Sequence, residues 1–165
     1  MIKKRLAVAF TGKSNSGKTT LIEKISKELI RRKKRVLIIK NDPKDKAIFD
    51  YEGKDSDKFY KTGADVFVTS PNRTTLFSHS YSDIDHMISI SPNFDYLLVE
   101  GLKTLPLPRI GIFRDEVDTD YIDYIDVVAT DSSIEERTVF KDLKILDLNS
   151  PESVIEWIDK NGKEI

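Results

Sequence analysis

Short apolar runs alternate with amphipathic stretches along most of the chain. The runs comprise residues 6–10, 36–39, 65–70, 96–100, 109–113 and 126–130. Unbroken apolar runs are typical of strands that are buried on both faces, and helices between them provide the crossovers that parallel strands require. The pattern therefore predicts an α/β fold, a three-layer sandwich with a mainly parallel sheet of buried strands.

Two stretches predict helices with defined ends. From Lys18 to about Arg32, apolar residues recur at spacings of three and four, with charged residues on the opposite face. Near the end of the chain, Ser150 is suited to cap a helix whose first turn contains Pro151. Asn161–Gly162 is suited to end that helix. We expect both helices to pack one apolar stripe on the sheet.

The middle of the chain departs from this regular alternation. Residues 41–57 are mostly polar and charged, which predicts a long loop over a functional site. Ser70-Pro71-Asn72 then separates the runs 65–70 and 74–80, which predict a β-hairpin at an antiparallel edge of the sheet. The length of 165 residues suits one ordinary domain, and we expect a single nucleotide-binding domain over 1–165.

Composition narrows the class of protein further. Hydrophobic residues make up 39% and charged residues 33%, which is typical of a folded chain. Lys and Arg number 27 against 28 Asp and Glu, so no global field favours nucleic acid or an anionic membrane as a partner. The absence of Cys excludes disulfides and thiolate metal sites, and only two His are present. Because the chain has no Cys, we expect it to reside in the reducing cytoplasm. No apolar segment is long enough to span a bilayer.

The candidate chemistry begins at a glycine-rich loop. Residues 12–20 read GKSNSGKTT and fit the pattern G-x-x-x-x-G-K-[ST], directly after a predicted strand and directly before a predicted helix. Gly12 and Gly17 let the backbone amides turn inward and cradle a polyphosphate. Lys18 is expected to reach the β- and γ-phosphates as a catalytic group, and the Thr19 hydroxyl to ligate Mg²⁺. The sequence therefore predicts a P-loop NTPase whose phosphate-binding residues are Gly12, Lys13, Ser14, Asn15, Ser16, Gly17, Lys18, Thr19 and Thr20.

A P-loop also requires an acidic group at the end of another strand. Glu100 ends the run 96–100 and is our candidate for ordering metal and water, although a strand-end carboxylate is also often merely exposed. Asp45 belongs to an acidic loop that can supply one contact to Mg²⁺. Lys13 is similar in place to the second lysine of dimeric P-loop ATPases, which crosses to the partner's nucleotide. Those enzymes have paired glycines where this chain has Ser14-Asn15.

The group that selects the base is less visible. No Asn-Lys-x-Asp run of the Ras-like GTPases is present. Asp131 follows the run 126–130, where its carboxylate can accept hydrogen bonds from N1 and N2 of guanine; a turn at the strand end explains it equally well. An isolated chain lacks an obvious arginine finger, which leaves Arg109 or Arg114 from a dimer mate or another partner.

Four stretches of the chain, in order, resemble one family. They are Gly12–Leu21 (GKSNSGKTTL), Gly53–Ser56 (GKDS), Gly63–Ala64 (GA) and Val99–Lys103 (VEGLK), the last followed by Leu107-Pro108-Arg109. From about residue 5 to about residue 131 the chain is similar to the molybdopterin-guanine dinucleotide biosynthesis protein B (MobB) family. The resemblance implies a GTP-binding homodimer with weak hydrolysis. It also implies a partnership with a MobA-like guanylyltransferase that attaches GMP to molybdopterin. The pattern leaves open whether molybdopterin binds this chain or only the transferase.

The resemblance also assigns individual positions. It places residues 12–20 on the phosphates, Glu100 with the metal, and Asp131 opposite the base. Asp55 and Ser56 are assigned to the site or to the dimer contact. Family members commonly carry histidines after the lysine of the second strand, whereas this chain has Asn41-Asp42-Pro43-Lys44-Asp45 after Lys40. Of that segment, only Asp45 is carried over, as a metal ligand.

Three functions follow from these patterns. The first is a slow GTPase, with GTP and Mg²⁺ as cofactors, that acts as an adaptor to the guanylyltransferase. The second is a P-loop small-molecule kinase or ATP-dependent enzyme whose acceptor site is the loop 41–57. The third is a nucleotide-sensing clamp that only docks a partner. The first is favoured because the family-specific stretches agree with the P-loop site, whereas the others use the P-loop alone.

Overall fold

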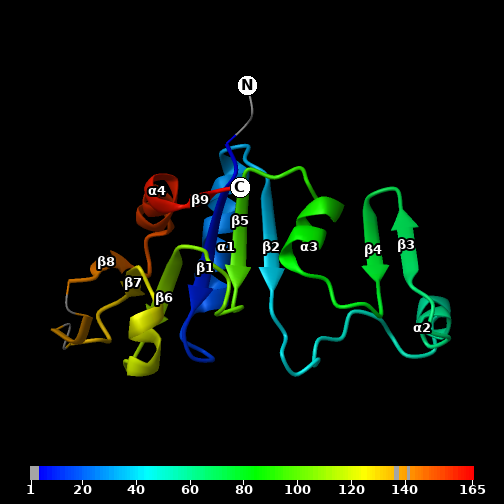
Figure 1. Ribbon diagram of the computed structural model, residues 1–165, viewed down its shortest axis with the longest axis horizontal. Coiled ribbons are helices and arrows are strands. Elements are labelled where there is room, and N and C mark those ends of the chain that lie inside the picture. Colours follow the sequence, from blue (N-terminus) through cyan, green and yellow to red (C-terminus); the bar gives the residue numbers. More distant parts are fainter. Residues whose placement is uncertain (1–3, 136–137, 141) are drawn as a thin grey trace. The chain divides into compact units, whose positions relative to one another are not determined.

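The computed structural model describes residues 4–135, 138–140 and 142–165 (Figure 1). These residues form two compact units. The expectation of a single nucleotide-binding domain over 1–165 stays a prediction. The P-loop unit comprises Met1–Asn41 and Asn93–Ile165, and the hairpin unit comprises Asp42–Pro92. In the described part of the chain, no helix is both long and apolar enough to cross a membrane.

The P-loop unit is built on a mostly parallel sheet, as the apolar runs predict. Its strand order is β2-β5-β1-β6-β7-β8, and β9 pairs antiparallel with the start of β1. The strands are β1 (Leu6–Thr11), β2 (Val36–Lys40), β5 (Tyr96–Glu100), β6 (Arg109–Phe113), β7 (Val127–Thr130), β8 (Lys144–Asp147) and β9 (Lys163–Glu164). The strands in the middle of the sheet are buried as expected. At the edge, β2 pairs only with β5 and is half-buried, with Ile38 exposed.

Two helices cover one face of this sheet. These are α1 (Lys18–Arg31) and α4 (Pro151–Asn161), and their apolar stripes join one buried cluster with alternate residues of β1, β5 and β6. Both predicted helices are confirmed, including the Ser150 side chain that accepts from the amide of Ser153. The opposite face carries a second cluster around Phe113 and Val128, next to the 3-10 segments η1 (Thr119–Tyr124) and η2 (Thr138–Phe140).

The hairpin unit contains two short helices and the predicted hairpin. The helices are α2 (Asp55–Tyr60) and α3 (Ile84–Ile90); the strands β3 (Val66–Ser70) and β4 (Arg73–Phe77) pair antiparallel. The hairpin is therefore confirmed. Its expected place at the edge of the parallel sheet was wrong, because β3 and β4 pair only with each other and form a sheet of their own. The run 65–70 was also wrong as a buried strand, because β3 is exposed from Phe67 to Ser70.

Candidate functional site

The glycine-rich loop joins the end of β1 to the start of α1. Gly12 and Gly17 both have positive φ, 147° and 98°, which side-chain-bearing residues rarely adopt. A Cβ atom at Gly12 would lie 2.4 Å from the carbonyl oxygen of Ile112, so only glycine fits there. The Lys18 ammonium donates to the carbonyl oxygens of Gly12, at 2.8 Å, and of Lys13. The loop therefore has the closed shape of a phosphate cradle.

Ser16 provides a test of whether this cradle suits a ligand. Its side chain is buried, and its Oγ has no hydrogen-bond partner among the residues that the structure describes. That oxygen lies 3.0 Å from where a Cβ atom of Gly12 would be, inside the loop. A buried hydroxyl without a partner costs about 1–3 kcal/mol. A phosphate oxygen in the cradle would accept the hydrogen bond that Ser16 lacks, so these residues fit the ligand that the motif predicts.

A cavity of about 430 Å³ opens beside the start of α1. It is lined by Ser14, Asn15, Gly17, Lys18, Thr19, Thr20, Lys40, Glu100 and Arg114. The structure thus brings Glu100 to the same cavity as Lys18 and Thr19, as expected from parallel strands that end at one edge of the sheet. We call this the phosphate cavity.

Glu100 has a partner that the sequence analysis missed. Lys40 ends β2, in register with Glu100 on β5, and its ammonium lies 3.1 Å from both carboxylate oxygens. Burial lowers the pKa of Lys18, the Coulombic effect of Glu100 opposes the shift, and nearby Lys40 lowers this pKa further. The only sequence signal for Lys40 was that a cation directly follows the run 36–39, whereas the run 96–100 ends in an acid. Two lysines and one carboxylate therefore share the cavity.

Asp131 follows β7 and accepts hydrogen bonds from Arg114 and Ser133. One carboxylate oxygen accepts from Arg114 Nε at 3.0 Å, and the other accepts from the amide and hydroxyl of Ser133. These hydrogen bonds, first those from Ser133 and then that from Arg114, hold the pKa of Asp131 below its usual value. Sequence reasoning missed Ser133 altogether, because nothing in a turn residue two positions after an aspartate marks it.

A second cavity of about 550 Å³ lies where β7 and β8 end. Asp131 lines it together with Thr130, Ser132, Ile145, Leu146, Asp147 and Asn149. The Thr130 hydroxyl is buried, and it has no hydrogen-bond partner among the described residues. The expectation that Asp131 faces a guanine base stays a prediction.

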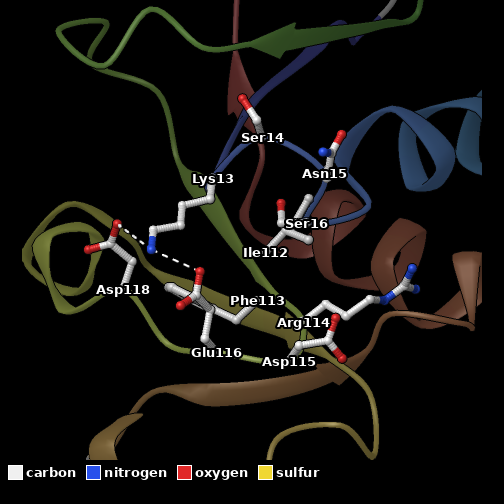
Figure 2. Close-up of a pocket in the computed structure, with 10 residues that line it drawn as sticks. All are labelled: Lys13, Ser14, Asn15, Ser16, Ile112, Phe113, Arg114, Asp115, Glu116 and Asp118. Carbon is white, nitrogen blue, oxygen red and sulfur yellow. Dashed lines mark hydrogen bonds and ion pairs between the residues drawn. The ribbon is translucent and has the colours of Figure 1, made fainter.

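Lys13 lies on a different cavity, of about 380 Å³, which Figure 2 shows. Its ammonium lies 2.9 Å from Glu116 Oε1 and 3.9 Å from Asp118 Oδ2, and the hydrogen bond to Glu116 raises the pKa of Lys13. In Figure 2 the Lys13 side chain points toward these acids, whereas the Arg114 side chain points another way. The structure thus pairs Lys13 within its own chain, and its contact with nucleotide stays a prediction.

Arg109 is not available as an arginine finger, contrary to one expectation above. Its side chain is 2% exposed and donates to the carbonyl oxygens of Gly101, Leu102 and Leu105. These bonds stabilise the loop after β5, where Leu102 has positive φ. A finger has to reach a neighbouring molecule, and a buried guanidinium that holds its own backbone does not.

The remaining predicted residues lie in the hairpin unit. Asp45 is exposed in a turn where its amide donates to the carbonyl oxygen of Asp42. Asp55 and Ser56 begin α2 and line an apolar cavity of about 640 Å³ with Tyr51, Phe59 and Phe67. Within the described ranges, no three His, Cys, Asp or Glu side chains gather as a metal-binding group. Metal binding by Asp45 therefore stays a prediction.

Comparison with known proteins supplies a family. Residues 7–131 match the sequence profile of molybdopterin guanine dinucleotide synthesis protein B. The chain is 32% identical to the molybdopterin-guanine dinucleotide biosynthesis adapter protein of Haemophilus influenzae, over 92% of this chain and 86% of that protein. It is 31% identical to the adapter protein of the same name from Escherichia coli, over 94% of each chain.

A solved structure has the same fold. The crystal structure of Bacillus subtilis MobB superposes with a TM-score of 0.74, over 96% of this chain and 98% of that chain. The sequence identity in this comparison is 21%. The fold class predicted from the apolar runs and the P-loop is thus confirmed.

Proposed function

The chain belongs to the MobB family of molybdopterin guanine dinucleotide synthesis proteins, and we propose that it is a GTP-binding, slowly hydrolysing adapter of this pathway. In this proposal it assists a MobA-like guanylyltransferase in attaching GMP to molybdopterin. It binds GTP with Mg²⁺ and acts as a homodimer in the cytoplasm.

The observation that carries the proposal is the phosphate cradle. Only glycine fits at residue 12, and the buried hydroxyl of Ser16 has no partner among the described residues. Lys18 and Glu100 line one cavity beside it. Backbone amides at a helix N-terminus and a lysine ammonium are complementary to a polyphosphate.

Each residue has a chemical part in this proposal. Lys18 exchanges its bonds to the carbonyl oxygens of Gly12 and Lys13 for the β- and γ-phosphates. Thr19, exposed in the first turn of α1, would hold Mg²⁺, which neutralises charge on the phosphates. In this proposal Glu100 orients the attacking water, and Asp45 is a further metal contact.

Slow hydrolysis agrees with the surroundings of Glu100. Lys40 donates to both of its carboxylate oxygens and so competes with a water for them, which weakens Glu100 as a group that orients the water. An adapter that senses nucleotide has no need of fast turnover, whereas phosphoryl-transfer enzymes such as kinases run at about 1–100 per second.

The test is a calorimetric titration of GTP and of ATP, each with Mg²⁺. The wild-type chain is expected to bind GTP more tightly than ATP, and Lys18→Ala to lose binding. Lys27→Ala is the matched control, because Lys27 is an exposed lysine of the same helix, paired with Glu23 and not in the lining of the phosphate cavity. A preference for ATP would contradict the proposal and favour the kinase or ATP-dependent enzyme. Equal heats of binding from wild type and Lys18→Ala would mean that the nucleotide does not bind at the P-loop.

The adapter part needs a second measurement. Formation of molybdopterin guanine dinucleotide by a MobA-like guanylyltransferase is expected to rise when the wild-type chain is added with GTP. The Lys18→Ala variant is expected to give no such rise. An unchanged yield with wild type would contradict the adapter role while leaving nucleotide binding intact.

A further inference from the structure

Arg114 lies against the phosphate-binding loop of its own chain. It directly follows β6, which pairs with β1, the strand that leads into the loop. Its guanidinium carbon is 3.6 Å, and both terminal nitrogens are 3.7 Å, from where a Cβ atom of Gly17 would be. Gly17 immediately precedes α1. The guanidinium therefore sits at the helix N-terminus, where an anion is most favoured.

Within the part of the chain that the structure describes, the guanidinium is anchored through Nε alone. Nε donates to Asp131 at 3.0 Å, and the Asp131 carboxylate is held in turn by Ser133. Among the described residues, Nη1 and Nη2 of Arg114 make no hydrogen bond, and the side chain is 36% exposed. Because the guanidinium is planar, fixing Nε also fixes the direction of the other donors. Asp131 thus holds the terminal N–H groups of Arg114 beside Gly17.

The charge of the phosphate cavity indicates what these N–H groups meet. Of the described residues that line it, Lys18, Lys40 and Arg114 are cations, whereas Glu100 is the single carboxylate. The whole chain has a net charge of -1, so this surplus of positive charge is local. A guanidinium with free terminal nitrogens is suited to bidentate contact with phosphate oxygens.

We propose that Arg114 binds the polyphosphate of the nucleotide in cis, and that Asp131 and Ser133 position it. The inference rests on the proposed function, since it concerns the same nucleotide. It replaces the expected finger from a dimer mate with a residue of the same chain. It also gives Asp131 a task other than reading guanine.

The test is the displacement of a fluorescent guanine nucleotide by GTP and, separately, by inorganic tripolyphosphate. Arg114→Ala is expected to weaken both competitors by the same factor, about tenfold or more, because charge-assisted hydrogen bonds to phosphate are lost. Arg31→Ala is the matched control, since Arg31 ends the same helix about 20 Å from the loop. It is expected to change neither affinity. A loss for GTP alone would show that Arg114 contacts the base or ribose and would overturn the inference.

Asp131→Asn separates positioning from base recognition. As a positioning residue, Asp131 affects binding only through Arg114, so the variant is expected to weaken GTP and tripolyphosphate equally, by a few-fold. The ratio of GTP to ATP affinity stays unchanged. If Asp131 reads guanine instead, the variant loses its preference for GTP while tripolyphosphate binds as before, which would contradict the assignment.

Two further results keep the inference independent of folding and of the proposed function. Arg114→Lys retains the charge and is expected to restore part of the tripolyphosphate affinity, which a residue needed only for packing would not do. If wild type binds no nucleotide, the proposed function itself fails. If wild type binds and Arg114→Ala binds equally well, the inference alone fails.

Discussion

The two units of the chain use similar apolar sequences in opposite ways. In the P-loop unit, β5 (YLLVE) is buried up to its last residue. In the hairpin unit, β3 (VFVTS) has only Val66 half-buried, and Phe67 is 64% exposed. The difference shows that an apolar run predicts a strand but not its burial. Burial depends on what the rest of the chain places on each face of the strand.

The two units also differ in the interactions that stabilise them. The P-loop unit has a continuous apolar core between its sheet and two helices. Residues 42–92 are all described, and none of them is buried. Hydrogen bonds and ring contacts connect the elements of this unit instead. For example, the Tyr60 hydroxyl donates to the carbonyl oxygen of Ser78, and the Tyr60 ring stacks on His79. An isolated two-stranded hairpin is marginally stable in water, so we expect the hairpin unit to open first.

The largest contrast is expected from removing one phenylalanine in each unit. Phe10→Ala empties a fully buried position and should lower the free energy of unfolding by about 3–5 kcal/mol. Phe67→Ala, at an exposed position, should change it by less than about 0.5 kcal/mol. Urea denaturation followed by circular dichroism measures both. Equal losses would mean that the hairpin unit contributes to the apolar core.

Two glycines with positive φ give the next contrast. Gly12→Ala combines a left-handed backbone with a Cβ atom 2.4 Å from a carbonyl oxygen, and should cost about 2–4 kcal/mol and abolish nucleotide binding. Gly53→Ala meets no atom within 4 Å and should cost only about 1–2 kcal/mol of backbone strain. Thermal melting and nucleotide titration of both variants test this, and nucleotide binding by Gly12→Ala would break the comparison.

The caps of two helices, one in each unit, should give a smaller contrast. Ser150 caps α4 and Asp83 caps α3, each through its side chain. Ser150→Ala should lower the global free energy of unfolding by about 1 kcal/mol, because α4 is part of the core. Asp83→Ala should leave global unfolding unchanged and speed hydrogen exchange only in α3. Slower hydrogen exchange in α3 than in α4 would contradict the expectation that the hairpin unit opens first.

The smallest expected effect is the loss of stability of each unit at acidic pH. Hydrogen bonds from Arg31 and Arg32 lower the pKa of Glu28 in α1 to about 2 from 4.5. In the hairpin unit, the amide of Gly53, followed by Lys61, lowers the pKa of Asp57. The folded state holds each proton less tightly than the unfolded state does. The stabilisation from Glu28 is thus complete above pH 4.5 and is lost as the pH falls toward 2.

NMR titration of the two carboxylates checks these directions. Glu28→Gln should flatten the dependence of stability on pH between about 4.5 and 2, and Asp57→Asn should do so for opening of the hairpin unit alone. An ordinary pKa at Glu28 would mean that its pairing with Arg31 and Arg32 does not persist in solution.

Local features of the sequence predicted much of the site. The loop of residues 12–20, the start of α1 at Lys18 and the cap at Ser150 all depend on neighbours within a few positions. Glu100 could be placed as well, because the ends of parallel strands share one edge of the sheet. These features follow from backbone conformation and hydrophobic period, which a short stretch of chain specifies by itself.

The contacts that complete the site come from tertiary structure. Lys40 meets Glu100 across 60 positions of sequence, and Arg114 meets Asp131 across 17. Arg109 is buried by the loop that it stabilises, and β3 is exposed although its sequence is apolar. The sequence by itself determined α1, α4, the glycine-rich loop and most strands, because these depend on local conformation and hydrophobic period; it did not predict α2, α3, β8 or β9. Only the fold decided the partners of the charged groups, because strand order and register bring distant residues together.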